Sequence, residues 1–339
     1  MSKLQRGGGN ALTEAFGVCV VGYGMGQWHC QAIRQVNGLR LVAVCELDET
    51  RRQRAIAEQG VKGYATLDDA LNDDAVQVIV LATPHDTHAP LAIQAMEAGK
   101  HVVVEKVMAP TVKDADEMIA ARDKNGVLLT VFHNRRFDSD FLTVRAVIEA
   151  GWLGDIVEVQ SSVGHYGKPR GWRAWRRHGG GMIYDWGAHL FDQLLQLFGT
   201  PSWVFCRMTY GGFDGDDYDV ETHSHTLVGF PSGVVGVVEL SHLWRLPRPR
   251  WRVIGTKGTL IKQTFDPNER AKIATNFGGL AAEMEVATVQ GDWLDFYRQW
   301  VAALKGEGEP PVKPEEARQV VQVICAALQS AQTGSVVPF

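Results

Sequence analysis

Residues 16–29 read FGVCVVGYGMGQWH, and this stretch decides the fold of the first half of the chain. An apolar run of strand length ends at Gly22, two more glycines follow at Gly24 and Gly26, and a segment with helical spacing begins. Glycines after a strand permit a tight turn and let the pyrophosphate of a dinucleotide approach the helix N-terminus. The spacing is GxGxG, one residue short of GxGxxG, so the interpretation depends on the rest of the chain.

Apolar runs of strand length alternate with helical segments as far as residue 133. Strands are predicted at 16–22, 39–46, 77–83, 101–106 and 127–133, and helices at 28–36, 48–59, 88–99 and 111–126. This alternation is typical of parallel strands joined by crossover helices. We therefore predict an α/β Rossmann domain with a doubly wound parallel sheet.

The second half of the chain has a different pattern. After a helix predicted at 139–150, strands with alternating polar and apolar residues are predicted at 155–166, 202–210, 221–230, 233–244 and 250–263, and late helices at 291–305 and 314–332. Successive strands without intervening helices predict an open, mostly antiparallel sheet. We expect a flexible leader at 1–15, a Rossmann domain at 16–136 and an α+β substrate and oligomerisation domain at 137–339.

Composition limits the class of protein. The 339 residues carry a formal charge of -5, from 34 basic and 39 acidic side chains, so nucleic acid is not expected as a partner. No segment has the apolar length of a signal peptide or a membrane span, so no membrane partner is expected. The five cysteines form no CxxC pair, which is typical of a reducing compartment and predicts a cytoplasmic protein.

Two further features favour a dinucleotide site. Glu46 ends the second predicted strand, where a carboxylate accepts hydrogen bonds from the adenosine ribose and repels a 2′-phosphate, so NAD is favoured over NADP. The motif ATPHDTH at 82–88 follows the next long strand, at the edge where ligands bind in open α/β sheets. Cofactor contacts are predicted from these two features and the turn: Gly22, Tyr23, Gly24, Met25, Gly26, Glu46, Thr83, Pro84 and His88. His88 also fits a second role, as a cap of the next helix.

The sequence GGGMIYDWGAHLFDQLLQLFG at 179–199 predicts an amphipathic helix that presents Asp185 and His189 four residues apart on one face. Such a pair fits either proton chemistry or a structural contact near a helix N-terminus. Together with His165 it also offers ligands for zinc or manganese. No HxH or HExxH pair lies near these residues, so no metal is predicted.

Several motifs in a fixed order resemble those of the glucose-fructose oxidoreductase and inositol dehydrogenase family, written Gfo/Idh/MocA. They are ATPHDTHAPLAIQAMEAGKHVVVEK at 82–106, NRRFD at 134–138, the glycine-led helix at 179–199 and GTKGTL at 255–260. The resemblance implies hydride exchange between NAD(P) and a sugar or polyol. It also implies an open C-terminal sheet that pairs with another subunit, so a homodimer or homotetramer is expected.

The resemblance also implies roles for particular residues. The family's Glu-Lys-Pro motif matches Glu105 and Lys106, both expected near the cofactor, but Val107 replaces the proline and its fixed φ. The family's aspartate and histidine match Asp185 and His189. We expect His189 to act as the base, Asp185 to orient its imidazole and Lys106 to stabilise the negative oxygen.

The segment GKPRGWRAWRRHGGG at 167–181 is the candidate sugar-binding loop. Trp172 and Trp175 are suited to stacking on a sugar, and Arg173 or Arg176 to binding hydroxyls, a carboxylate or a phosphate. The glycines are expected to let backbone and sugar approach closely. Substrate contacts are predicted from Lys106, His165, Trp172, Arg173, Trp175, Asp185 and His189. The alternative is a loop or subunit contact anchored by the tryptophans.

Three functions fit these observations. The first is an NAD-dependent dehydrogenase of a sugar, sugar derivative or cyclitol. The second is a glycosidase or epimerase with tightly bound NAD that is recycled through a keto-sugar, which produces no net NADH. The third is a non-catalytic NAD-sensing regulator, which would need none of Lys106, Asp185 and His189.

Overall fold

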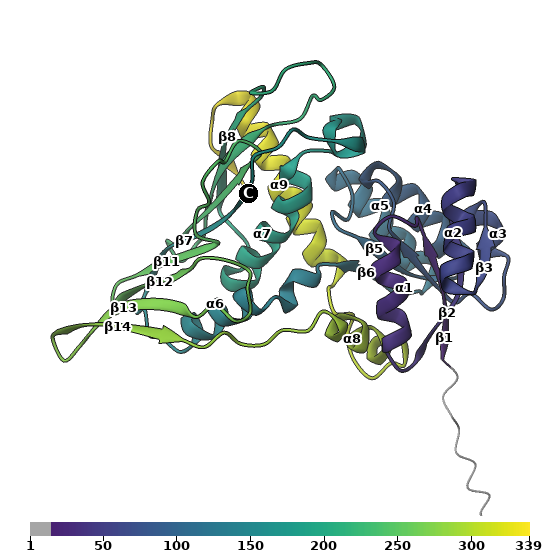
Figure 1. Cartoon of the computed structure of the whole chain (residues 1–339), viewed down its shortest axis with the longest axis horizontal. Coiled ribbons are helices and arrows are strands. Elements are labelled where there is room, and N and C mark those ends of the chain that lie inside the picture. Colours follow the sequence, from purple (N-terminus) through teal and green to yellow (C-terminus); the bar gives the residue numbers. More distant parts are fainter. Residues whose placement is uncertain (1–14) are drawn as a thin grey trace, which may run out of the picture.

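The computed structural model describes residues 15–339, so nearly all of the leader predicted at 1–15 lies outside the described residues. Two sheets organise the chain, and each has helices packed against it (Figure 1). This confirms the predicted combination of a parallel Rossmann sheet with a mostly antiparallel C-terminal sheet.

The first sheet has six strands, and all of its pairings are parallel. Its order is β3 (Lys62–Tyr64), β2 (Leu39–Cys45), β1 (Phe16–Val21), β4 (Val78–Leu81), β5 (His101–Glu105) and β6 (Leu129–Phe132). The connecting helices are α1 (Gly26–Gln35), α2 (Glu49–Gln59), α3 (Leu67–Leu71), α4 (His88–Glu97) and α5 (Val112–Asn125). The strand order reverses between β1 and β4, which is where ligands bind in such sheets.

Local sequence explains most of these boundaries. The four residues of β4 are all buried, as expected for a central strand covered on both faces. Helix α2 starts where the Asp48 side chain accepts the Arg51 N–H, and it ends at Gly60 in a left-handed conformation. The short elements β3 and α3 were not predicted, because three and five residues are too few to show a period.

The second sheet has nine strands, of which only β7 and β10 pair in parallel. Its order is β14 (Leu280–Val286), β13 (Ala271–Phe277), β12 (Gly258–Lys262), β11 (Trp251–Gly255), β7 (Ile156–Gly164), β10 (Val235–Ser241), β9 (His223–Gly229), β8 (Trp203–Thr209) and β15 (Val337–Pro338). The single strand predicted at 250–263 is the hairpin β11–β12. The hairpin β13–β14 was not predicted.

Helices α6 (Ser139–Glu149), α7 (Met182–Phe198) and α9 (Pro314–Thr333) cover one face of this sheet. Figure 1 shows α7 and α9 between the sheet and the Rossmann domain. Eleven of the 17 residues of α7 are buried, so this helix is a central element of the molecule. It carries Asp185 and His189 in its first half.

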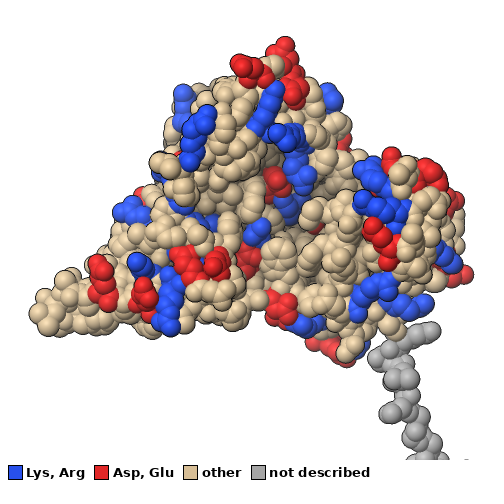
Figure 2. Space-filling model, viewed as in Figure 1, with Lys and Arg blue, Asp and Glu red and all other residues tan. Residues whose placement is uncertain are grey.

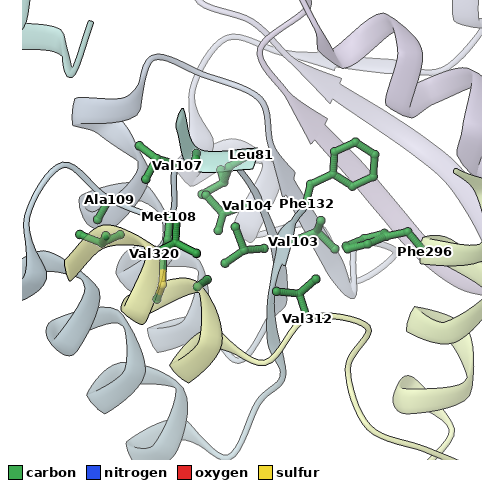
Figure 3. Packing of buried hydrophobic residues seen from close by; sticks show 14 of the residues in the cluster. Leu81, Val103, Val104, Val107, Met108, Ala109, Phe132, Phe296, Val312 and Val320 are labelled. Atoms are coloured by element: carbon green, nitrogen blue, oxygen red, sulfur yellow. The ribbon is translucent and has the colours of Figure 1, made fainter. Parts of the chain in front are cut away.

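The chain returns to the Rossmann domain after the second sheet. Phe296, in α8 (Leu294–Leu304), packs edge-on against Phe132 of β6 with ring centroids 4.7 Å apart. Figure 3 shows Val312 and Val320, which belong to the last part of the chain, among the buried residues of β5 and the segment that follows it. Residues that lie far apart in the sequence therefore form one core. This packing does not test the domain boundary predicted at residue 136, which stays a prediction.

Within residues 15–339, no helix has the length and apolar content required to span a membrane. The five cysteines are free thiols, and four of them are buried. They act as small core residues.

Candidate active site

A cavity of about 730 Å³ lies between the two domains, at the C-terminal ends of β1, β4 and β5. Figure 2 shows this face hollowed between the domains, with Lys and Arg side chains along the upper part of the hollow. The cavity has an end lined by the glycine turn and Glu46, and an end lined by Lys106 and α7.

The three glycines of the first turn have different structural roles. Gly22 has a φ of +88°, and a Cβ there would lie 2.5 Å from the carbonyl oxygen of Ala82. A Cβ at Gly26 would lie 2.9 Å from Val20, so this glycine allows α1 to pack on β1. Gly24 has nothing within 4 Å of its Cβ position and lines the cavity. The three positions match the three glycine roles of a dinucleotide-binding turn.

The N-terminus of α1 has no side-chain cap, and the N–H groups of Gln27 and Trp28 donate to the carbonyl oxygens of Gly24 and Met25. The N–H groups just before them, in the turn itself, are the ones that a phosphate would meet. Met25 lines the cavity beside this end, whereas Tyr23 and Gly26 do not line it. Tyr23 is buried and its hydroxyl donates to Glu58 at 2.7 Å. Tyr23 and Gly26 therefore shape the turn from behind.

Glu46 lines the cavity beyond the turn and is held by backbone groups. Its carboxylate accepts the N–H of Tyr23 and the N–H of Asp48, each at 3.0 Å. The guanidinium of Arg51 lies 3.4 Å from the same carboxylate and also lines the cavity. The residue predicted to contact the ribose thus lines the cavity, with a cation beside it that the sequence did not point to.

The motif at 82–88 contributes to the cavity, but not as predicted for every residue. Thr83 and Pro84 line it, as does His85, which was not predicted. His88 does not line the cavity. It is fully buried, with Nδ1 2.8 Å from the Val107 carbonyl oxygen and Nε2 3.0 Å from that of Thr83. The imidazole therefore ties two loops together instead of contacting a ligand.

Glu105 and Lys106 end β5 and line the cavity. Glu105 Oε1 lies 3.0 Å from His29 Nε2, and His29 Nδ1 lies 2.7 Å from the hydroxyl of Tyr297 in α8. The peptide bond from Lys106 to Val107 is cis. Since His29 and Tyr297 are buried, this network fixes the strand end from which Lys106 projects.

The glycine run before α7 has a packing role, not the predicted contact with sugar, since none of the three glycines lines the cavity. A Cβ at Gly180 would lie 2.5 Å from the carbonyl oxygen of Arg173, and one at Gly181 would lie 2.4 Å from Glu221. The Glu221 carboxylate accepts the N–H of Ile183 at 2.7 Å. The glycines thus let a buried carboxylate cap α7 and let the Arg173 segment pack on its N-terminus.

Asp185, His189 and Lys106 all line the same cavity, but the pairing differs from the one expected. The Asp185 carboxylate contacts the Lys106 ammonium, which also donates to the Asp185 backbone oxygen at 2.9 Å. Its other oxygen lies 3.2 Å from Arg173 Nε. Burial alone raises the pKa of Asp185, but Lys106 and Arg173 outweigh it and hold the pKa well below its ordinary value. Asp185 therefore orients cations and does not hold the imidazole.

His189 is 5% exposed, and its Nδ1 has no hydrogen-bond partner within residues 15–339. Burial, followed by the positive charges of Lys106 and Arg135, lowers the pKa of His189 well below its ordinary value. The ring is therefore neutral near pH 7 and able to accept a proton. The rings of His133 and Trp186 pack beside it, with centroids 6.2 and 6.1 Å away.

Only part of the predicted sugar-binding loop reaches the cavity. Trp172 and Arg173, in the short 3₁₀ helix Gly171–Ala174, line it. Trp175 does not, and its ring instead packs against Arg177 with 4.8 Å from guanidinium to ring centre. His165 is exposed and packs on His242. The chain turns between Arg173 and Trp175, so neighbours in sequence face different surroundings.

Other residues of the substrate end were not singled out from the sequence. They are Trp28, His85, Phe132, Asn134, Arg135, Trp186 and Trp293. His85 lies within the motif at 82–88 that was assigned to the ligand-binding edge, and Arg135 within a motif that was noted for its resemblance to a family. Arg135 stacks on Trp186 at 4.3 Å and bonds to Asp138 at 2.7 Å. Within residues 15–339 no group of three or more His, Cys, Asp or Glu is arranged to hold a metal ion.

The comparisons with known proteins cover both domains. The family described as "Oxidoreductase family, NAD-binding Rossmann fold" matches residues 16–133, and "GFO/IDH/MocA C-terminal domain" matches residues 141–261. The uncharacterized oxidoreductase YdgJ of Escherichia coli (strain K12) is 31% identical over 95% of this chain and 98% of its own. The scyllo-inositol 2-dehydrogenase (NADP(+)) IolW of Bacillus subtilis (strain 168) is 29% identical over 78% of this chain and 80% of its own.

A solved structure of an NAD-binding protein from Listeria innocua has a TM-score of 0.88 at 30% identity, covering 96% of this chain and 97% of that chain. The chain belongs to the Gfo/Idh/MocA family of NAD-binding oxidoreductases.

Proposed function

We propose that the protein is an NAD-dependent oxidoreductase that transfers hydride between a secondary alcohol of a sugar, sugar derivative or cyclitol and the nicotinamide. One observation carries this proposal. The glycine turn, Lys106 and the pair Asp185 and His189 line a single cavity, although they come from three separate parts of the chain.

The cavity suits a dinucleotide bound along the ends of β1, β2 and β4. Gly24 and Met25 would face the pyrophosphate, and Glu46 the adenosine ribose. The Glu46 carboxylate is fixed by two backbone N–H groups, so a 2′-phosphate would meet a held negative charge. NAD is therefore the proposed cofactor. The guanidinium of Arg51, beside Glu46, is the group that would bind the 2′-phosphate if NADP were used instead.

The chemistry requires removal of a proton and a hydride from one carbinol. We assign the proton to His189, whose neutral imidazole is an acceptor inside the cavity. Lys106 places its ammonium beside the oxygen that becomes negative. When bound, NAD accepts the hydride from the carbinol carbon, so the alcohol loses two electrons and two hydrogens and becomes a ketone.

Asp185 takes a different role from the one predicted. Since it contacts Lys106 through both its carboxylate and its backbone oxygen, it fixes where the ammonium points. Its pKa is held well below the ordinary value, so it keeps its negative charge throughout the neutral range. We assign it the positioning of Lys106.

A screen of sugars and cyclitols with NAD, followed by NADH absorbance and product analysis, tests the proposal. Lys106→Ala and His189→Ala should each lower hydride transfer about a hundredfold or more while NAD still binds. Lys113→Ala is the matched control, since Lys113 is 82% exposed on α5. Altered sugars without net NADH would assign the protein to the glycosidase or epimerase alternative. NAD binding with no sugar chemistry would assign it to the regulator alternative.

We also propose that two copies pair through the C-terminal sheet. Phe205, Leu227 and Val237 form a row across β8, β9 and β10, on the face opposite the buried row of Cys206, Thr226 and Val238. Beside it runs a row of Arg207, His225 and Glu239, with opposite charges at its ends. Such rows can pair with themselves across a two-fold axis. Light scattering should give at least a dimer, and Leu227→Asp should give a monomer if this face is the contact.

The thiols support a reducing, cytoplasmic location. All five cysteines are free, and burial raises the pKa of Cys19, Cys30 and Cys45 above its ordinary value, which disfavours the reactive thiolate. Cell fractionation with an antibody against the protein tests this location.

A further inference from the structure

Arg173 is the cation of the cavity that lacks a carboxylate of its own. Its Nε lies 3.2 Å from Asp185 Oδ2, at an angle that makes no hydrogen bond. The same carboxylate is already in contact with Lys106. Within residues 15–339, no other carboxylate pairs with Arg173, and its terminal nitrogens donate no hydrogen bond to the protein. One carboxylate therefore faces two cations.

The other carboxylates near this end of the cavity do not pair with Arg173. Asp138 pairs with Arg135. Glu105 lies beside Lys106, with one oxygen on His29 and the other accepting the Lys106 backbone N–H at 3.1 Å. Among the described residues, the carboxylate of Asp185, which also contacts Lys106, is therefore the nearest negative charge that Arg173 has.

One face of the guanidinium is covered by an aromatic ring. It stacks on the ring of Trp172, with 4.4 Å from guanidinium to ring centre, and His85 packs edge-on against the same ring at 4.6 Å. The backbone oxygen of Arg173 accepts the Gly181 N–H at 2.9 Å, which anchors the segment to the start of α7. A planar fork that is held flat and open on its outer edge matches the two oxygens of a carboxylate or phosphate.

We propose that the substrate is a sugar or cyclitol that carries an anionic oxygen group, a carboxylate or a phosphate, and that Arg173 binds this group. The inference rests on the proposed function and deepens it. Lys106 faces the reacting hydroxyl, and Asp185 lies between the two cations, so the anionic group lies on a carbon near the reacting one. Trp172 provides the apolar surface beside it.

Matched pairs of neutral and anionic compounds test the proposal with the NAD-loaded enzyme. D-glucose is compared with D-glucuronate and D-glucose 6-phosphate, and myo-inositol with its 1-phosphate. The measured quantity is the ratio of kcat/KM for the anionic compound to kcat/KM for its neutral partner. We expect this ratio to exceed one for the carboxylate or the phosphate arm, and the arm that wins identifies the group. A ratio below one in every pair would overturn the proposal.

Variants assign the preference to Arg173. Arg173→Gln should lower the ratio about 10- to 100-fold, the value of one charge-assisted contact. Arg173→Lys should restore part of it, since it keeps the charge without the fork. Arg177→Gln is the matched control: it removes the same charge from the same segment outside the cavity, and should leave the ratio unchanged. An equal loss for neutral and anionic compounds in Arg173→Gln would contradict anion recognition.

Binding measurements keep the two proposals separate. Calorimetry with the same compounds reports the anionic preference even where no NADH forms. Preferential binding of the anions that Arg173→Gln abolishes, without turnover, would retain the ligand class and contradict the dehydrogenase function. Turnover of neutral sugars with no anionic preference in rate or binding would retain the function and overturn the ligand class.

Discussion

The buried carboxyl of Glu221 makes folding stability depend on pH in a way that one substitution isolates. Glu221 is 4% exposed and caps the first turn of α7 through the N–H of Ile183. Burial raises its pKa from the ordinary 4.5 to about 7, although the hydrogen bond from Ile183 acts in the opposite direction. The native protein therefore keeps this proton over a range in which the unfolded chain has lost it.

The sign and size of the effect follow from this difference. Between pH 4.5 and about 7 the native state binds one proton more than the unfolded state at this group, so the free energy of unfolding falls as the pH rises. The stabilising contribution of the neutral carboxyl is complete below 4.5 and is lost above about 7. At about 1.4 kcal/mol per tenfold change in proton affinity, the full loss is about 3 kcal/mol.

Glu221→Gln tests this value directly. The amide keeps an oxygen that accepts the Ile183 N–H but does not ionise. Urea unfolding should show the variant within about 1 kcal/mol of the wild type at pH 5, and more stable by about 3 kcal/mol at pH 8. Glu307→Gln, at an exposed position, is the control and should follow the wild type. Parallel stability curves for Glu221→Gln and the wild type would refute the reasoning.

Three substitutions and one change of pH test other parts of the site. Glu46→Ala should reduce the preference for NAD over NADP, because it removes the fixed carboxylate at the ribose; cofactor titrations with no change in the ratio would argue against that contact. Gly22→Ala should cost about 2 kcal/mol or more in urea unfolding, because of its φ of +88° and the 2.5 Å approach to Ala82. Gly24→Ala, which has open space, should keep its stability and bind NAD more weakly. The profile of kcat/KM should show no limb from His189 as the pH falls through 6.5, since the pKa of His189 lies well below that value, and an acid limb at or above 6.5 that persists in Glu221→Gln would exclude His189 as the base.

Most of the Rossmann domain could be predicted from the sequence, because its strands are buried on both faces. Runs such as VIVL in β4 are continuously apolar and need no tertiary information to be recognised. The hairpin β13–β14 lacks that signal: its second strand is exposed or half-exposed at every position and contains two alanines and two glutamates. The hairpin forms strands because β13 pairs with β12. Pairing between strands that are apart in the sequence has little effect on local composition, so it could not be predicted.

The same distinction applies to the site. The order of the motifs predicted that Lys106, Asp185 and His189 share one cavity, and they line one in the structure. The partner of Asp185 could not be predicted from helical spacing, because Lys106 lies 79 residues away in the sequence. Its ammonium is charged, so it binds the Asp185 carboxylate in preference to the neutral imidazole of His189. Spacing also could not separate Arg173 from Trp175, since a turn of 3₁₀ helix directs only one of them to the cavity. These assignments as catalytic or substrate-binding residues remain predictions.

The aromatic cluster beneath the glycine turn has a consequence for biosynthesis. Trp28 and Phe132 belong to the part of the chain made first, yet Trp293, Phe296 and Tyr297 pack against them. While the ribosome is still elongating the large sheet, the nascent Rossmann domain has an uncovered aromatic surface, which is a typical binding site for chaperones. A fragment that ends before residue 293 would never cover the aromatic surface formed by Trp28 and Phe132. Such fragments should therefore aggregate and should not accumulate as free nucleotide-binding domains.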